Sequence, residues 1–388
     1  MPYLLALPWL ALLAFLVFRV RLPRELPAAV SDGRSASVPS VSVIVPARNE
    51  AVNIEACVGS LTGSDYRDFE IVVVDDRSDD DTAARARRVP LGRARRIEVV
   101  DGAELPEDWL GKPWACAQGA AAATGDVLLF TDADTIHQPA LLGRAVAGLT
   151  EDGADLLTVS GRQLMETFWE RVVQPQVFFT MILRFFDVDG ALRKGKWRDA
   201  IANGQFMMFP RGSYEDLGGH EAVKDEVVED LAMAQHVVRS GRVLAVRLAE
   251  ADFATRMYRS LSDLVKGWSK NLMMGGLQTV PPPLRPFMAP ASLLMGVGLW
   301  LVPPVVLALS LAGVLGDPWQ TWSTAVVGLS LLLWVPVTAR MGAPGWYGAL
   351  YPLGAAVGTY IFVRSWIGGR RVEWKGRRYV VRDLAERP

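Results

Sequence analysis

Two carboxylates stand close together in the segment Thr131-Asp132-Ala133-Asp134, directly after the apolar run Val127–Phe130. Because that run has the composition of a buried strand, both acids should project from a strand end. Aspartates at this spacing can hold a hard divalent cation, Mg²⁺ or Mn²⁺, against diphosphate oxygens. The cation would then offset the negative charge that develops on a leaving diphosphate. A strand-ending turn would also favour Asp, but the further features below favour the metal site.

A second acidic group, Asp75-Asp76, follows the apolar run Ile71–Val74. A carboxylate at this place can accept hydrogen bonds from a nucleobase or a ribose. The acids Asp79–Asp81 have a simpler explanation as N-capping and first-turn residues of the next helix. We therefore predict a binding role for Asp76, with Asp75 as a second candidate.

The first predicted strand ends in the polar segment Val43-Ile-Val-Pro46-Ala-Arg48-Asn49-Glu50. It opens the next helix at the same edge of the sheet as the two acidic groups. Asn49 and Glu50 are also explained as capping residues, so the loop alone does not indicate function.

Lys112 follows Gly111 and precedes a helix of small residues. A lysine near the carboxyl ends of the strands can reach the phosphates of a bound nucleotide. A single exposed lysine after a glycine is equally ordinary, so both interpretations stay open.

Glu229 and Asp230 begin the helical pattern Leu231–Arg239. The helix dipole stabilises acids in a first turn, and this is the explanation that we favour for Glu229. Asp230 is the candidate general base, which would accept a proton from an acceptor hydroxyl. His220 lies nearby in sequence and is predicted to be structural.

Short β-branched runs alternate with helical patterns between residues 41 and 250. This alternation predicts an α/β fold with a mostly parallel central sheet, in which ligands bind beyond the carboxyl ends of the strands. The predicted strands are Val41–Val45, Ile71–Val74, Ile97–Val100, Val127–Phe130 and Leu156–Val159, and the predicted helices lie near 50–62, 79–88, 114–124 and 138–150.

Composition excludes several classes of protein. The 41 basic and 42 acidic residues nearly cancel, which argues against a nucleic-acid partner. The two cysteines provide no disulfide framework, and the three scattered histidines form no zinc motif. The apolar excess lies at the two ends of the chain, which indicates a membrane protein.

The ends of the chain set the predicted domain organisation. The apolar start, followed by Arg19, Arg21 and Arg24, predicts an uncleaved anchor with a cytoplasmic C-terminal flank. The predicted parts are an anchor at 1–24, a linker at 25–40, a catalytic domain at 41–275 with a possible interfacial helix at 168–186, a transmembrane region at 286–366 and a basic cytoplasmic tail at 367–388.

The number of membrane spans stays open at this point. Apolar stretches cover about 287–315, 321–339 and 346–363, and Pro303-Pro304 should kink the first. With a cytoplasmic catalytic domain, three spans would place the basic tail outside, against the usual charge rule. Either the first stretch is a re-entrant pair or one stretch does not span.

Taken together, these motifs resemble the family 2 glycosyltransferases of the GT-A fold. The likeness covers roughly residues 40–270. It rests on an ordered set: Val43–Glu50, Val74–Ser78, Gly111-Lys112, Gly125-Asp126, Asp132–Asp134 and Glu229-Asp230.

The resemblance implies a metal-dependent hexosyltransferase that inverts the anomeric carbon in one displacement, with a UDP-sugar preferred over a GDP-sugar as donor. The roles that it implies are nucleotide-sugar binding by Pro46, Arg48, Glu50, Asp76, Lys112 and Asp132, metal ligation by Asp134, base catalysis by Asp230 and acceptor-side contacts by Glu229 and Trp268.

One departure from the family concerns polymer synthesis. Processive members carry Gln/Arg-x-x-Arg-Trp after the base, whereas Leu264-Val-Lys-Gly-Trp268 keeps only the tryptophan. Trp268 is also explained as an interfacial anchor. The whole layout, with its closing Glu373–Tyr379, is similar to bacterial enzymes that glycosylate hopanoids or carotenoids.

We therefore expect an integral protein of the inner membrane, with a cytoplasmic catalytic domain and a lipid acceptor such as a carotenoid, a hopanoid or another isoprenoid. The alternatives are a processive polysaccharide synthase and a non-catalytic membrane scaffold that retains the fold.

Overall fold

The chain forms two compact units in this computed structural model, which describes residues 2–29, 38–369, 371–374 and 377–380. The sheet unit contains Pro23–Arg162, Val188–Met257 and Arg370–Pro388. The helical unit contains Met1–Leu22, Gln163–Asp187 and Tyr258–Gly369. The predicted linker and basic tail fall partly outside the described residues, and the predicted domain boundaries stay predictions.

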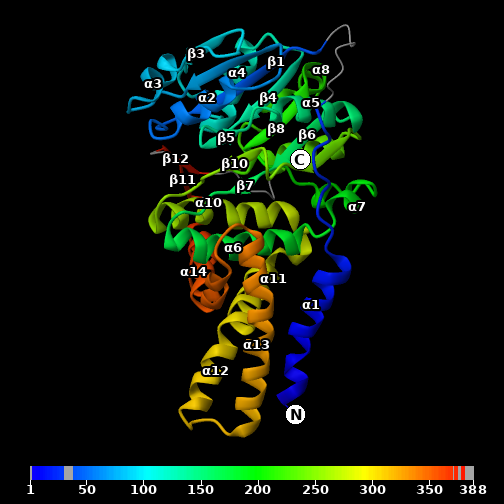
Figure 1. The fold of residues 1–388 in the computed structure, drawn as a ribbon, viewed down its shortest axis with the longest axis vertical. Coiled ribbons are helices and arrows are strands. Elements are labelled where there is room, and N and C mark those ends of the chain that lie inside the picture. The colour runs from blue at the N-terminus through cyan, green and yellow to red at the C-terminus, as the bar shows by residue number, and fades with distance from the viewer. Residues whose placement is uncertain (1, 30–37, 370, 375–376, 381–388) are drawn as a thin grey trace. The chain divides into compact units, whose positions relative to one another are not determined.

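A seven-stranded sheet organises the sheet unit (Figure 1). Its strand order is β3-β2-β1-β4-β8-β6-β9, and only β8 runs antiparallel to its neighbours. The strands are β1 (Val41–Ala47), β2 (Phe69–Asp75), β3 (Ile97–Asp101), β4 (Val127–Thr131), β6 (Leu156–Ser160), β8 (Phe206–Pro210) and β9 (Leu244–Leu248). The predicted α/β class with a mostly parallel sheet is confirmed, and the five predicted strands are β1, β2, β3, β4 and β6.

The strand order reverses between β1 and β4, which makes this pair the topological switch point of the sheet. Pairing of β1 with β4 ends at Ile44 and Phe130, whereas β1 continues beside β2 as far as Ala47. Pro46 lies in this last stretch, where β4 no longer needs a backbone donor from β1. The two strands therefore part at their carboxyl ends, where ligands bind in sheets of this kind.

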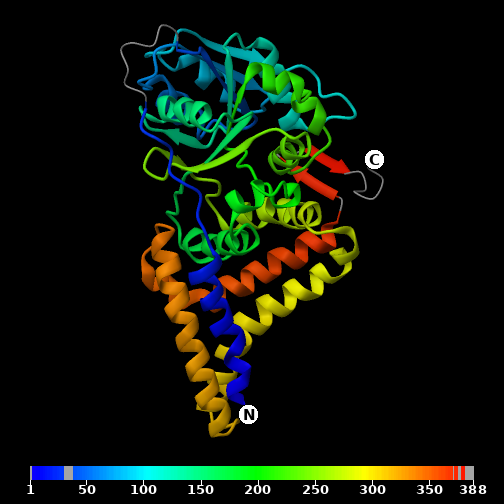
Figure 2. The ribbon, with the colours of Figure 1, turned by 90° about the vertical axis from the view of Figure 1, so that its right-hand side faces the viewer.

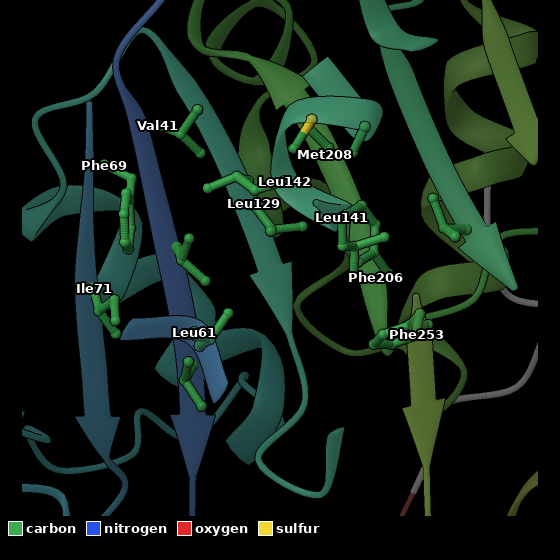
Figure 3. Close-up of a cluster of buried hydrophobic side chains, with 14 of the residues drawn as sticks. Val41, Leu61, Phe69, Ile71, Leu129, Leu141, Leu142, Phe206, Met208 and Phe253 are labelled. Carbon is green, nitrogen blue, oxygen red and sulfur yellow. The ribbon is translucent and has the colours of Figure 1, made fainter. Parts of the chain in front are cut away.

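Helices cover the sheet and close its core. They are α2 (Ile54–Thr62), α3 (Thr82–Arg88), α4 (Gly111–Ala122), α5 (Leu141–Glu151), α7 (Val188–Leu192), α8 (Arg211–Asp216) and α9 (Glu229–Arg239), with short 3₁₀ turns at Trp197–Asp199 and Gly219–Val223. The amphipathic helix α5 buries Leu141 and Leu142 against strand residues such as Leu129 and Phe206 (Figure 3). Burial of these apolar side chains is the main stabilising contribution to this layer.

Two small sheets complete the strands. β5 (Thr135–His137) pairs with β10 (Phe253–Thr255), and β7 (Arg162–Gln163) lies on the other side of β10. β11 (Arg371–Trp374) and β12 (Arg377–Val380) form an antiparallel hairpin. The sequence analysis identified none of these strands. β5, β7 and β10 are two or three residues long, which is shorter than the runs that periodicity detects.

The helical unit consists of helices from both ends and the middle of the chain (Figure 2). They are η1 (Pro2–Ala6), α1 (Leu7–Arg19), α6 (Phe168–Arg184), α10 (Leu261–Thr279), η4 (Pro282–Leu284), α11 (Arg285–Leu293), η5 (Leu294–Leu299), α12 (Val302–Leu311), α13 (Asp317–Arg340), η6 (Gly345–Leu350) and α14 (Tyr351–Gly368). Thr167 caps α6 in a reciprocal capping box with Glu170.

Two segments are long and apolar enough to cross a membrane by length and composition, Pro282–Leu311 and Asp317–Arg340. Both expose large apolar side chains, among them Leu311 and Leu332. Large exposed apolar patches are typical of surfaces that contact a membrane or another protein. The N-terminal helix Leu4–Arg19 is apolar but shorter. These features weakly support the predicted membrane helices.

The first segment is interrupted where the sequence predicts a kink. A π-helical turn at Leu294–Leu299 precedes α12, and Pro303 and Pro304 lie in the first turn of α12. A proline is tolerated there because that turn needs no backbone donor.

The third apolar stretch becomes α14, which does not qualify as a span among the described residues. It packs against α6 and α10. Gly354 makes the approach to α6 possible, because a Cβ at this position would lie 2.4 Å from the carbonyl oxygen of Val172.

Candidate active site

The loops that follow β1 and β2 are bonded to each other. Arg48 donates from Nη1 to the carbonyl oxygens of Asp76 and Arg77, at 2.6 Å in each case. Asn49 accepts a 2.8 Å hydrogen bond from the backbone of Asp79, and the backbone of Glu50 donates to Thr82 at 2.8 Å. The predicted nucleotide-binding residues Arg48, Glu50 and Asp76 are therefore brought together by one network.

This network changes the interpretation of two predicted capping groups. Asp81 is the N-cap residue of α3 but makes no side-chain cap. Asp80 instead accepts a hydrogen bond from the backbone of Thr82 at 3.0 Å. Asn49 crosslinks the loops rather than capping α2, whose N-cap is Asn53. These polar side chains fix the loops at the carboxyl edge of the sheet.

Backbone strain is concentrated in the same loops. Asn49 and Arg77 adopt positive φ values of 53° and 55°, and they are the two non-glycine residues with positive φ in the described part of the chain. A left-handed conformation is costly for a side chain such as that of Arg77, and it persists where surrounding bonds impose it. Such strain is typical of ligand-binding loops.

Asp75 and Asp76 are both buried at the end of β2. Burial raises the pKa of Asp76 above its usual value, and Arg377 and Arg48 oppose this shift. Asp75 accepts a 3.3 Å hydrogen bond from the backbone of Ser78 through Oδ2. Its other oxygen, Oδ1, is buried without a hydrogen-bond partner among the described residues, which leaves an acceptor for a ligand N–H or O–H group.

A charge cluster lies around Lys112, in the first turn of α4. Its Nζ lies 2.8 Å from Oδ1 of Asp132 and 2.8 Å from Oε1 of Glu229. The same Nζ lies 3.5 Å from the carbonyl oxygen of Gly204. The structure therefore brings Lys112, Asp132 and Glu229 together from α4, the end of β4 and the start of α9.

The cluster holds more negative than positive charge. Burial lowers the pKa of Lys112, but Asp132, Glu229 and Asp230 raise it well above its usual value. Burial raises the pKa of Asp132, Lys112 lowers it, and Glu229 and Glu50 raise it again. The lysine is therefore firmly cationic, and several carboxylates share it.

Asp230 is held by two backbone donors. Its Oδ2 accepts from the backbone N–H of Gly204 and its Oδ1 from that of Leu231, each at 2.8 Å. Burial and then Glu229 raise the pKa of Asp230 to about 6, against the opposing effect of Lys112. A carboxylate with such a pKa is mostly ionised at neutral pH and is basic enough to accept a proton.

Gly204 lets the backbone approach this cluster. A Cβ at Gly204 would lie 2.9 Å from Oδ2 of Asp230 and 3.1 Å from Nζ of Lys112. Any larger residue would push against both charged groups.

The turn with Asp132 and Asp134 rests on a buried polar network. Thr135 donates from its hydroxyl to the carbonyl oxygen of Asp132 at 2.7 Å. The hydroxyl of Thr255 donates to the carbonyl oxygen of Asp134 at 3.3 Å. His137 lies 3.1 Å from the hydroxyls of Thr131 and Thr135. Burial lowers the pKa of His137 to about 3, so this histidine is neutral and structural.

The donor set suits a hard divalent cation in part. Asp132 and Asp134 supply the carboxylate oxygens that Mg²⁺ and Mn²⁺ prefer. No group of three or more metal-ligating side chains occurs in the part of the chain that the structure describes. A cation held here would therefore take its remaining ligands from diphosphate oxygens or water.

The remaining predicted residues have clear places. Trp268 is buried on α10 in the helical unit, where it contacts Phe178 and Tyr258. Its acceptor-side role stays a prediction. His220 is buried and bonded through Nδ1 to the hydroxyl of Tyr214 at 2.8 Å, so its predicted structural role agrees with its surroundings.

Sequence reasoning missed several residues of this site. Thr135, His137 and Thr255 lie in short strands whose pairing brings them under the acidic turn. Arg377 was placed in a basic tail, whereas the structure pairs it with Asp76. Among these residues, only Arg377 lies in a segment that the sequence analysis singled out, Glu373–Tyr379.

Comparison with known proteins bears on the family and the fold of the chain. The sequence model of glycosyl transferase family 2 matches residues 42–218. The predicted resemblance to that family is confirmed over these residues. The matched region includes every predicted site residue except Glu229, Asp230 and Trp268.

Two relatives from Staphylococcus aureus strains MRSA252 and RF122 are named 4,4'-diaponeurosporenoate glycosyltransferase. Each is 26% identical to this chain over 356 residues, and the match covers 88% of both proteins. A mannosyltransferase of Pyrobaculum calidifontis, solved in complex with GDP-Man and Mn²⁺, has the same fold. It is 21% identical, with a TM-score of 0.53, and the match covers 93% of this chain and 99% of that one.

Proposed function

We propose that this glycosyltransferase transfers a sugar from a nucleotide-sugar to a carotenoid-type lipid at a membrane, with inversion at the anomeric carbon and with a divalent metal ion. The observation that carries the proposal is the cluster of Lys112 with Asp132 and Glu229, next to the half-buried carboxylate of Asp230. The names of the relatives, which match this chain over most of its length, support a lipid acceptor.

The chemistry needs three functions from the protein. Asp230 accepts the proton of the acceptor hydroxyl as the new glycosidic bond forms and the bond to the diphosphate breaks. Lys112 stabilises the negative charge that develops on the departing nucleoside diphosphate. A single displacement of this kind inverts the anomeric configuration and forms no covalent enzyme intermediate.

A divalent ion bound by Asp134 and Asp132 would neutralise the leaving diphosphate. Before the donor arrives, Lys112 supplies the positive charge next to Asp132. Asp134 would be the metal ligand, and Asp132, which is paired with Lys112 in the structure, would contact the diphosphate and its cation. The UDP-sugars are the first donors to test, followed by the GDP-sugars.

The nucleoside end of the donor would lie at the loops after β1 and β2. Arg48 and Glu50 frame this end, Pro46 shapes the end of β1, and Asp75 and Asp76 provide buried carboxylates. The preformed hydrogen bonds between these loops reduce the entropy that donor binding must remove.

We further propose that the protein is integral to the inner membrane, with the sheet unit on the cytoplasmic side. The N-terminal helix and the two long apolar segments would then anchor it. Because α14 does not qualify as a span, two C-terminal crossings return the chain to the side from which it left. The hairpin of β11 and β12, which carries several arginines, would then be cytoplasmic, in agreement with the positive-inside rule.

The decisive experiment uses the full chain in detergent with a panel of UDP- and GDP-sugars, Mn²⁺ or Mg²⁺, and a carotenoid carboxylic acid or hydroxy-carotenoid. Mass spectrometry of the organic phase should show a product heavier by one sugar, and chelation with EDTA should abolish it. The proposal would be contradicted by transfer to soluble acceptors at the same rate, by long polymer, or by no transfer from any donor.

A further inference from the structure

The hairpin of β11 and β12 belongs to the sheet unit although it follows the last helix of the helical unit. Arg377 begins β12 and pairs with Trp374 across the antiparallel ladder. The chain therefore ends its described part next to the strands that carry the predicted nucleotide site.

Arg377 and Asp76 form a two-point ion pair. Nη1 of Arg377 lies 2.5 Å from Oδ2 of Asp76, and Nη2 lies 3.1 Å from Oδ1. This parallel geometry is the strongest arrangement of a guanidinium with a carboxylate, and it fixes the plane of the arginine. Both oxygens of Asp76 are thereby engaged.

The two partners differ in their exposure. The side chain of Asp76 is 1% exposed and that of Arg377 is 18% exposed. The arginine side chain, and not the carboxylate, is thus the accessible member of the pair. A buried carboxylate that orients a partly exposed arginine is a common way to preorganise a binding group.

The surroundings suit a nucleoside diphosphate. Arg48 adds a second guanidinium to this edge through its bonds to the carbonyl oxygens of Asp76 and Arg77. Asp75, the neighbour of Asp76, has the buried and unpartnered Oδ1 described above. Donors from arginine and an acceptor from aspartate match a ligand that carries phosphate or carbonyl oxygens and also N–H or O–H groups.

We propose that Arg377 is a donor-binding residue whose guanidinium contacts oxygen atoms of the nucleoside diphosphate, and that Asp76 is a positioning residue that orients Arg377. The C-terminal hairpin is then part of the donor site, and Asp76 acts on the nucleotide through the arginine. This inference rests on the proposed function, because it takes the loops after β1 and β2 as the nucleotide site.

The test is a double-mutant cycle on the full chain in detergent, with UDP and GDP as titrants and calorimetry as the readout. The variants are Arg377→Ala, Asp76→Asn and their combination. Arg87→Ala is the matched control, because Arg87 on α3 forms an exposed pair with Asp101 at the end of β3, 2.5 Å apart.

Each single change should weaken nucleotide binding about tenfold, the effect of losing one charged hydrogen bond. The combination should bind no more weakly than the weaker single variant, because both changes remove the same contact. Arg377→Lys should not restore affinity, since an ammonium lacks the planar fork. Millimolar guanidinium chloride should partly restore nucleotide binding to Arg377→Ala. The turnover of Arg377→Ala at saturating donor should stay within about twofold of the wild-type value.

Unchanged binding in Arg377→Ala would overturn the proposal, as would a combined loss equal to the product of the two single losses. The second result would mean that Asp76 contacts the nucleotide independently. Thermal unfolding guards against misfolding, and the combined variant avoids an uncompensated buried carboxylate if Arg377→Ala alone does not fold.

The failure of this inference differs from the failure of the proposed function. If the wild-type chain binds nucleotide, and the cycle behaves as expected, but no donor yields a glycosylated lipid, only the proposed function fails. If the lipid product forms but Arg377→Ala binds normally, only this inference fails. Wild-type protein that binds neither nucleotide contradicts both.

Discussion

The two edges of the candidate site differ in how their carboxylates are paired with basic side chains. At the ends of β1 and β2, buried Asp76 has its own arginine, and Arg48 ties the two loops together. At the end of β4 and the start of α9, Asp132 and Glu229 share Lys112 with Asp230 nearby. At the first edge buried Asp76 is paired with an arginine of its own, whereas at the second edge several carboxylates share one lysine.

The difference indicates a division of labour. The preformed hydrogen bonds between the loops of the first edge suit it to binding a ligand without rearrangement. An edge with surplus carboxylates raises the pKa of one of them, here Asp230, and attracts a cation. We therefore assign nucleotide recognition to the first edge and sugar transfer to the second.

The largest effect is expected for Asp230→Asn, which removes the base from the charge-rich edge. With a hydroxyl acceptor, turnover should fall about 10³-fold, within the range for loss of a general base. With a carboxylic acid acceptor the loss should be smaller, because such an acceptor ionises in water without help. Initial rates with both acceptors measure the difference, and equal losses would show that Asp230 has another role.

Lys112→Met should lower turnover at pH 7 by about 10²-fold, as expected when a group that stabilises transition-state charge is lost. Because Lys112 lowers the pKa of Asp230, the acidic limb of the pH–rate profile should also move to higher pH. Lys224→Met is the control, since Lys224 pairs with Asp108 near the surface, 2.5 Å away. An unshifted profile in Lys112→Met would contradict the shared-charge account.

Gly204→Ala should reduce turnover about tenfold, because its Cβ would press on Asp230 and Lys112 and displace the base. Gly212→Ala provides the comparison, since nothing lies within 4 Å of a Cβ at that position. Nucleotide affinity should be unchanged in both variants. Equal turnover in the two variants would mean that the backbone at Gly204 is not close to the reacting groups.

The mildest test varies only the pH. Asp230 must be ionised to accept a proton, and its pKa is about 6. The value of kcat/KM should therefore be half-maximal near pH 6 and fall about tenfold per unit below it. Nucleotide binding at the ends of β1 and β2 should vary less over the same range, because Arg377 and Arg48 oppose the rise in the pKa of Asp76. A profile that is flat down to pH 4.5 would exclude Asp230 as the base.

The sequence predicted the parts of this site that lie at strand ends. Asp132, Asp76, Lys112 and Asp230 follow strong apolar runs or open clear helical patterns, so their common edge followed from parallel strand order. The charge pairing within the site depends on tertiary contacts that the sequence does not show. The sharing of Lys112 by Asp132 and Glu229 depends on a meeting of α4, β4 and α9 that no local pattern reports.

Other elements escaped because their signals are short or distant. β8 is antiparallel and lies between β4 and β6, which strand alternation does not indicate. The contact of Arg377 with Asp76 joins residues 301 positions apart. In the helical unit, apolar content predicted helices but not which of them span, because α14 packs against α6 through Gly354.

The most direct test of the division of labour measures nucleotide affinity and turnover in the same two variants, Asp230→Asn and Arg377→Ala. The account predicts that Asp230→Asn keeps its affinity for the donor nucleotide and loses turnover, whereas Arg377→Ala loses affinity and keeps turnover at saturating donor. Loss of the same quantity in both variants would contradict it, because the two edges would then perform one function together.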